Sequence, residues 1–122
     1  MSGSHLRSLL AAVALIILDP ALSAAELARF AVSIQARKID PAQQTLRAKQ
    51  GDIVELAFSS DETVDLHLHG YDREISVRPG ATSVMRIEAK IAGRFAIEAH
   101  RFGAGSGRSR HVVLLYLEIH PR

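Results

Sequence analysis

The sequence predicts an all-β sandwich of seven or eight short, mostly antiparallel strands, preceded by a signal peptide helix. Along several segments after residue 29, apolar and polar residues alternate with the two-residue period of half-buried strands. Turn-forming residues interrupt these segments at intervals of about ten residues, a spacing typical of sandwiches and barrels. No segment after residue 25 has a convincing helical pattern, and 122 residues are enough for one domain but not for two.

Residues 1–25 are predicted to be a secretory signal peptide. Arg7 supplies a positive charge, and 9–18 form an unbroken apolar run that is shorter than the about 20 residues needed to cross a bilayer. Small residues around Ala24 favour cleavage there, which leaves a mature domain over 26–122. A buried N-terminal helix or an uncleaved anchor is the alternative. We therefore expect a periplasmic or secreted protein that meets the membrane only during export.

The first half of the mature chain is expected to form strands over 30–37, 44–49, 53–59 and 64–69. Asp40 and Pro41 end the first of these, and a Gln-Gly-Asp turn ends the second. The fourth alternates most strictly. Its apolar residues face one side, and Asp65, His67 and His69 face the other.

The second half is expected to form strands over 74–77, 83–90, 94–100 and 111–120. Pro-Gly and Ala-Gly pairs supply turns between them. The segment 101–110, rich in Gly and Arg, is predicted to be the longest loop. Because Trp is absent, Phe30, Phe58 and Phe95 are the expected larger side chains of the core.

The composition argues against several functional classes. The 15 basic and 13 acidic residues are dispersed, without interleaved aromatic residues, so no nucleic-acid partner is expected. The absence of cysteine excludes disulfides, zinc–thiolate sites and a thiol nucleophile. The serines show no arrangement with a fixed base that would activate a nucleophile, so the protein is not expected to be an enzyme.

Four short motifs occur in order from residue 49. They are KQGDIVEL at 49–56, LHLHGYD at 66–72, VRPGAT at 77–82 and AGRFAI at 92–97. In their order and spacing they resemble the cupredoxin superfamily, especially plastocyanin-like domains and the cupredoxin-like domain of periplasmic iron-uptake proteins. The resemblance implies a Greek-key β-sandwich and a copper site.

One departure from the family pattern changes the expected chemistry. By the family's spacing from Gly93 and Phe95, the copper cysteine would fall at Ala99, and no methionine follows in the loop. A blue-copper site needs a Cys thiolate together with two His and a weak axial ligand. The chain is therefore expected to be a variant that lacks the blue-copper cysteine and is not a blue-copper electron carrier.

Histidines are the candidate metal ligands that are left. The predicted ligands are His67, His69, His100 and His111. Two of them stand two residues apart on one strand and so project from the same face. The resemblance implies that His69 matches the family's first ligand, and that the strand carrying His100 lies in the same sheet. Imidazole suits copper and zinc, so we expect a copper ion, or alternatively zinc, helped by Glu98 or Asp65.

We therefore expect a metal-binding carrier, sensor or accessory factor. The alternative is a metal-free interaction module that presents a sheet face to a periplasmic protein partner, with His67 pairing across strands with Asp65 or Glu98. A mononuclear copper enzyme is a third reading, although no feature of the sequence indicates its substrate pocket. His120, beside Pro121, is expected to be exposed and outside any site. Imidazoles that converge within a few ångströms would favour the first reading over the second.

Overall fold

In the computed structural model, residues 13–17, 25–103 and 111–122 are described. Most of the predicted signal peptide and residues 104–110 of the predicted loop lie outside these ranges. Residues 13–17, within the predicted signal peptide, have no regular secondary structure and their side chains are exposed. None of the described residues lies in a helix long and apolar enough to span a membrane.

Eight strands and one short 3-10 helix make up the described domain. They are β1 (Leu27–Ile34), η1 (Pro41–Gln43), β2 (Thr45–Lys49), β3 (Ile53–Ser60), β4 (Val64–Leu68), β5 (Arg73–Val77), β6 (Ser83–Glu88), β7 (Gly93–Phe102) and β8 (Val112–His120). All eight predicted strands are present. The Asp40 carboxylate caps η1 by accepting a hydrogen bond from the Ala42 N–H, at 2.9 Å.

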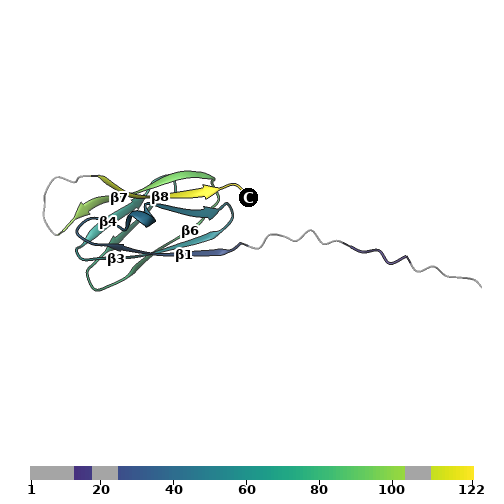
Figure 1. Ribbon diagram of the computed structural model, residues 1–122, viewed down its shortest axis with the longest axis horizontal. Coiled ribbons are helices and arrows are strands. Elements are labelled where there is room, and N and C mark those ends of the chain that lie inside the picture. The colour runs from purple at the N-terminus through teal and green to yellow at the C-terminus, as the bar shows by residue number, and fades with distance from the viewer. Residues whose placement is uncertain (1–12, 18–24, 104–110) are drawn as a thin grey trace, which may run out of the picture.

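The strands form two sheets that stack as the two layers of a sandwich (Figure 1). The smaller sheet has the order β1-β3-β6, and the larger has the order β2-β8-β7-β4-β5. Four of the six strand pairings are antiparallel, while β1–β3 and β2–β8 are parallel. The predicted sandwich of mostly antiparallel strands is therefore confirmed, with two parallel pairs added.

The core lies between the two sheets, where alternate residues of each strand project inward. Leu56 and Phe58 of β3 face Leu66 and Leu68 of β4 across this space, and all four are essentially inaccessible to solvent. Burial of each such side chain stabilises the fold by about 1.5–3 kcal/mol. Of the three predicted aromatic core residues, only Phe58 is fully buried.

Phe30 and Phe95, by contrast, are partly buried and pack against the core from its margin.

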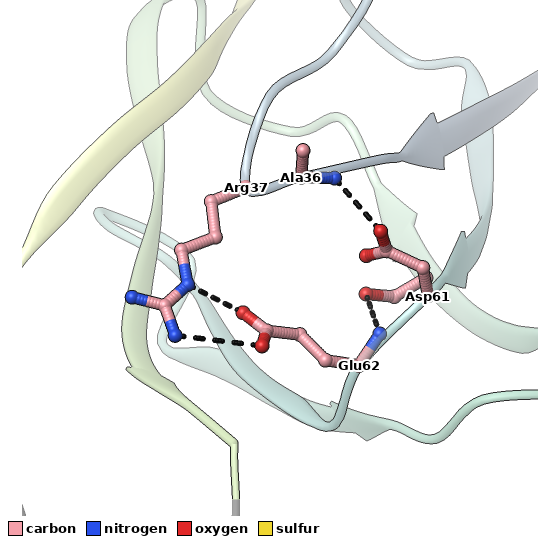
Figure 2. Close-up of polar contacts among 5 residues, drawn as sticks. Ala36, Arg37, Asp61 and Glu62 are labelled. Carbon is pink, nitrogen blue, oxygen red and sulfur yellow. Dashed lines mark hydrogen bonds and ion pairs between the residues drawn. The ribbon is translucent and has the colours of Figure 1, made fainter.

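The strand β1 ends three residues before the predicted limit because the chain turns at Ala36 and Arg37. Both have positive φ, 49° and 65°, and two backbone hydrogen bonds close the turn as a two-residue hairpin. Figure 2 shows how the neighbouring turn holds it: the Ala36 N–H donates to Asp61, and the Arg37 guanidinium donates twice to Glu62. These hydrogen bonds offset the free-energy cost of the left-handed backbone conformation, which is about 1–2 kcal/mol for a non-glycine residue.

The turn that follows β4 is anchored to β7. Gly70 has φ 84°, and a Cβ atom at this position would lie 2.5 Å from Cδ1 of Phe95. Tyr71 stacks edge-on against the same ring, with centroids 4.9 Å apart. Its hydroxyl donates to the Ile91 carbonyl and accepts from the Ile91 N–H. This packing fixes the backbone immediately after His69.

Candidate metal centre

The four predicted histidine ligands lie on, or directly beside, three neighbouring strands of the larger sheet. His67 lies on β4 and His69 directly follows it, His100 lies on β7, and His111 directly precedes β8. On β4 the leucines face the core, so His67 projects from the outer face of the five-stranded sheet. The antiparallel β4–β7 register places His67 opposite Glu98. The site therefore lies on the solvent side of the larger sheet.

A β-bulge determines the position of His100. Asp65 pairs with Arg101 and the next residue, Leu66, pairs with Ala99, so His100 is the extra residue of β7. A bulge bends its strand and redirects the extra side chain. A second irregularity lies on the other side of β7, where Leu114 is the extra residue of β8. A strict two-residue period cannot anticipate either feature.

The imidazole rings lie close together in a continuous row. The His67 ring centroid is 4.3 Å from that of His69 and 5.1 Å from that of His100. The rings of His69 and His100 are 6.1 Å apart, and His111 is 4.3 Å from His100 at the other end of the row. The structure thus brings together all four predicted residues.

The possible ligand atoms fall into two overlapping groups. One nitrogen from each of His67, His69 and His100 forms a set whose members all lie within 4.8 Å of one another. Glu98, His100 and His111 form a second such set. His120 belongs to neither; it is half-exposed and lies 3.3 Å from the Glu118 carboxylate. Either set supplies three donors to one cation.

Glu98 lies between these groups. Its Oε2 atom is 2.9 Å from His69 Nε2, 3.6 Å from His100 Nε2 and 3.4 Å from His111 Nδ1. The pKa of Glu98 lies below its ordinary value, chiefly through its hydrogen-bonding interaction with His69 and also through His111, while desolvation opposes the shift. The carboxylate therefore stays ionised and supplies negative charge to the imidazoles.

His67 has an unsatisfied ring nitrogen. Its Nδ1 is shielded from solvent and has no hydrogen-bond partner within the described parts of the chain. Its Nε2 lies 3.6 Å from Oδ1 of Asp72, a residue outside the predicted ligand set. A buried polar atom without a partner costs about 1–3 kcal/mol, and a neutral imidazole nitrogen with a free lone pair is a metal donor.

Asp65, the other predicted helper, contacts different residues. Its carboxylate accepts a hydrogen bond of 2.6 Å from the Ser76 hydroxyl, and it lies 3.9 Å from the Arg101 guanidinium. It belongs to neither group of possible ligands. Of the two predicted acidic helpers, Glu98 is therefore the one that belongs to a group of possible ligands.

No protein-family model matches this sequence, and no curated protein matches it. Solved structures do match. A heme-copper terminal oxidase dimer aligns with 75% of this chain at 19% identity and a TM-score of 0.58. A multi-copper oxidase from Pseudomonas thermotolerans aligns with 80% at 20% identity and a TM-score of 0.57, and a copper binding protein in its apo form aligns with 76% at 13% identity and 0.55.

The chain has a cupredoxin-like fold. It spans 64% of the matched terminal oxidase chain, 30% of the multi-copper oxidase and 87% of the copper binding protein. At these identities the likeness establishes the architecture. The chemistry of the site follows from the residues themselves.

The residues present do not fit a blue-copper centre of the cupredoxin-like fold. Ala99, where the family's cysteine is expected, is fully buried and pairs with Leu66, so its side chain faces the core. The histidines lie on the opposite face of that sheet. Met85 is buried on β6 in the other sheet. The imidazole and carboxylate donors fit a nitrogen-rich site for a divalent ion instead.

Proposed function

We propose that this protein is an exported cupredoxin-like protein that binds a copper ion through its histidine cluster. It serves as a copper carrier, sensor or accessory factor, and it is neither an enzyme nor a blue-copper electron carrier. The single observation that carries the proposal is the convergence of His67, His69, His100 and His111, from three separate segments, on one sheet face. A polar surface strand has no need of this convergence.

Copper is favoured by the kind of donor. Sites built from imidazole and carboxylate bind first-row divalent ions in an order that peaks at Cu(II), ahead of Zn(II). The unsatisfied Nδ1 of His67 gains a partner when an ion binds. Structures of similar fold include a heme-copper oxidase, a multi-copper oxidase and a copper binding protein. Zinc is the natural competitor in a binding assay.

The exposure of the cluster supports a delivery or sensing role. The side chain of His69 is 45% exposed and that of His111 is 59% exposed. An ion at this face is within reach of a partner protein. Export is supported by the short apolar run over 9–18 behind Arg7. The proposed location is accordingly the periplasm or the extracellular space.

A metal-free interaction module in the periplasm is the second candidate function. The observation in its favour is that the Glu98 carboxylate already lies within 4 Å of three imidazoles, and so interacts with them without an ion. Under this alternative the outer face of the larger sheet binds a protein partner. The two functions differ in whether the cluster takes up copper with defined stoichiometry.

A Cu(II) titration followed by electron spin resonance tests the proposal. We expect a single nitrogen-coordinated signal that saturates at one ion per chain and survives an equal concentration of Zn(II). His67→Ala and His100→Ala should each lose most of this signal. His120→Ala is the matched control, because His120 lies outside the cluster, and it should bind like the wild type. Copper uptake that is the same in all four proteins would refute the proposal.

A further inference from the structure

We infer that the cluster is a two-position site along which one copper ion moves between an outer and an inner set of ligands. The outer position consists of Glu98, His100 and His111, and the inner position consists of His67, His69 and His100. This inference rests on the proposed copper binding and deepens it. It assigns entry and exit of the ion to His111.

The first argument is that the four imidazoles do not form one ligand set. The possible ligand atoms form two groups of three, and within each group all three atoms lie within 4.8 Å of one another. Among the described residues, His100 is the one that belongs to both groups. Among the described residues, the His111 ring contacts the His100 ring and neither of the other two imidazoles of the cluster. His111 therefore extends the row outward and does not complete the inner set.

The second argument concerns the number of ions. A neutral imidazole has one nitrogen with a free lone pair, because the other carries the proton. His100 therefore holds one ion at a time, at either position. The cluster accordingly takes one ion that alternates between two positions, and not two ions side by side.

The third argument is the difference in exposure between His111 and His67. The side chain of His111 is 59% exposed, that of His69 is 45%, that of His100 is 25% and that of His67 is 16%. His111 is thus the most exposed ligand of the two sets and His67 the least exposed. An ion that arrives at the outer set therefore meets His111 first, and His67 is the last ligand that it reaches.

Glu98 contacts both positions. Its Oε2 atom lies 3.4 Å from His111 Nδ1 and 2.9 Å from His69 Nε2, which belong to different sets. The step is a ligand exchange. Bonds from copper to Glu98 and His111 are replaced by bonds to His67 and His69 while His100 stays bound. No electron is transferred, and the ion keeps an anionic neighbour throughout.

The test measures the kinetics of copper exchange in the full chain. The protein is loaded with one equivalent of Cu(II), and EDTA is then added in a stopped-flow instrument. For His111→Ala we expect an unchanged one-to-one stoichiometry and spin-resonance signal but about tenfold slower loading and removal, equivalent to about 1.4 kcal/mol in the barrier. Loss of an ordinary ligand would accelerate removal, so the direction of the change is diagnostic.

Two further variants complete the test. His67→Ala, with His67→Gln as a more conservative partner, should lose the inner signal and release copper faster than the wild type, because only the outer set is left. His120→Ala should match the wild type in stoichiometry and in both rates. Circular dichroism verifies that each variant is folded.

The outcomes separate the two proposals. A wild-type protein that binds no copper would overturn both. Copper binding by the wild type, with exchange rates in His111→Ala equal to or faster than those of the wild type, would overturn the two-position site alone. Saturation at two ions per chain would also overturn it.

Discussion

His67 stands directly opposite Glu98 across the β4–β7 pair, and the Glu98 carboxylate reaches past it to His69, His100 and His111. One acidic side chain thus lies within 4 Å of three imidazoles of the cluster. Because this contact needs no metal, it has consequences for the stability of the metal-free protein.

We expect Glu98→Gln to destabilise the metal-free protein in a pH-dependent manner. The pKa of Glu98 is lowered from 4.5 in the folded state, chiefly by His69. A lowered folded-state pKa contributes stability that is present above pH 4.5 and is lost as the pH falls through the folded-state value. The unfolding free energies of wild type and variant should therefore differ above that pH and converge in stronger acid.

Urea unfolding in the presence of EDTA measures this difference. Glu88→Gln is the control, because Glu88 is an exposed carboxylate whose ion pair within the described residues is with the exposed Lys90, and it should show little difference at any pH. A gap between wild type and Glu98→Gln that persists unchanged into strong acid would argue against the charge interaction as its cause.

Gly70→Ala should destabilise the fold more than Gly51→Ala. Both glycines have positive φ, 84° and 93°, so each substitution pays about 1–2 kcal/mol for left-handed strain. A Cβ atom at Gly51 meets nothing within 4 Å, whereas one at Gly70 collides with the Phe95 ring. The collision adds about 1–3 kcal/mol of overpacking.

Denaturant unfolding of the two variants side by side isolates the steric part. Equal destabilisation would mean that the Phe95 ring moves aside at no cost, and the tight packing assigned to this turn would be wrong.

Tyr71→Phe should cost about 1 kcal/mol of stability, because the Tyr71 hydroxyl both donates to and accepts from the backbone of Ile91. The ring itself, stacked on Phe95, is retained in the variant. Tyr116→Phe is the matched control. The Tyr116 hydroxyl has no hydrogen-bond partner in the described parts of the chain, so its removal should change stability by less than about 0.5 kcal/mol. Thermal unfolding that ranks the two variants in the opposite order contradicts the role of the hydroxyl.

Ala99→Cys should fail to create a blue-copper site. The new thiol would face the core beside Leu66, on the side of the sheet opposite His67. Blue copper requires the thiolate and two imidazoles on the same ion. Absorption spectra recorded during Cu(II) addition should therefore lack the intense thiolate-to-copper band, as in an Ala99→Ser control. Appearance of that band would show that the thiol at position 99 and the histidines bind the same copper ion, which contradicts their placement on opposite faces of the sheet.

Much of the fold could be predicted from local sequence. Alternation of apolar and polar residues depends only on the pleat of a strand, so the eight strands and their inward faces were predictable, including Leu66, Leu68 and Ile97. The same local rule places His67 and His69 on one face. The absence of cysteine alone excludes a blue-copper centre.

Other features depend on contacts between distant segments. The turn at Ala36 and Arg37 carries no glycine or asparagine, and it is stabilised by carboxylates about 25 residues away in the chain, so β1 was predicted to end too late. The parallel pairs β1–β3 and β2–β8 likewise follow from how the sheets assemble. No local period encodes which strand becomes a neighbour.

The histidine cluster, too, was predictable in part from local sequence and in part depends on tertiary structure. Residue types and spacing identified the four imidazoles as candidates, because chemistry and strand periodicity are properties of the chain itself. The tertiary structure decided that β4 lies beside β7, that a bulge aims His100 at His67, and that Glu98 lies within reach of both ligand sets. Register and bulges are settled by packing across two sheets, and that packing exists only when the whole domain has folded.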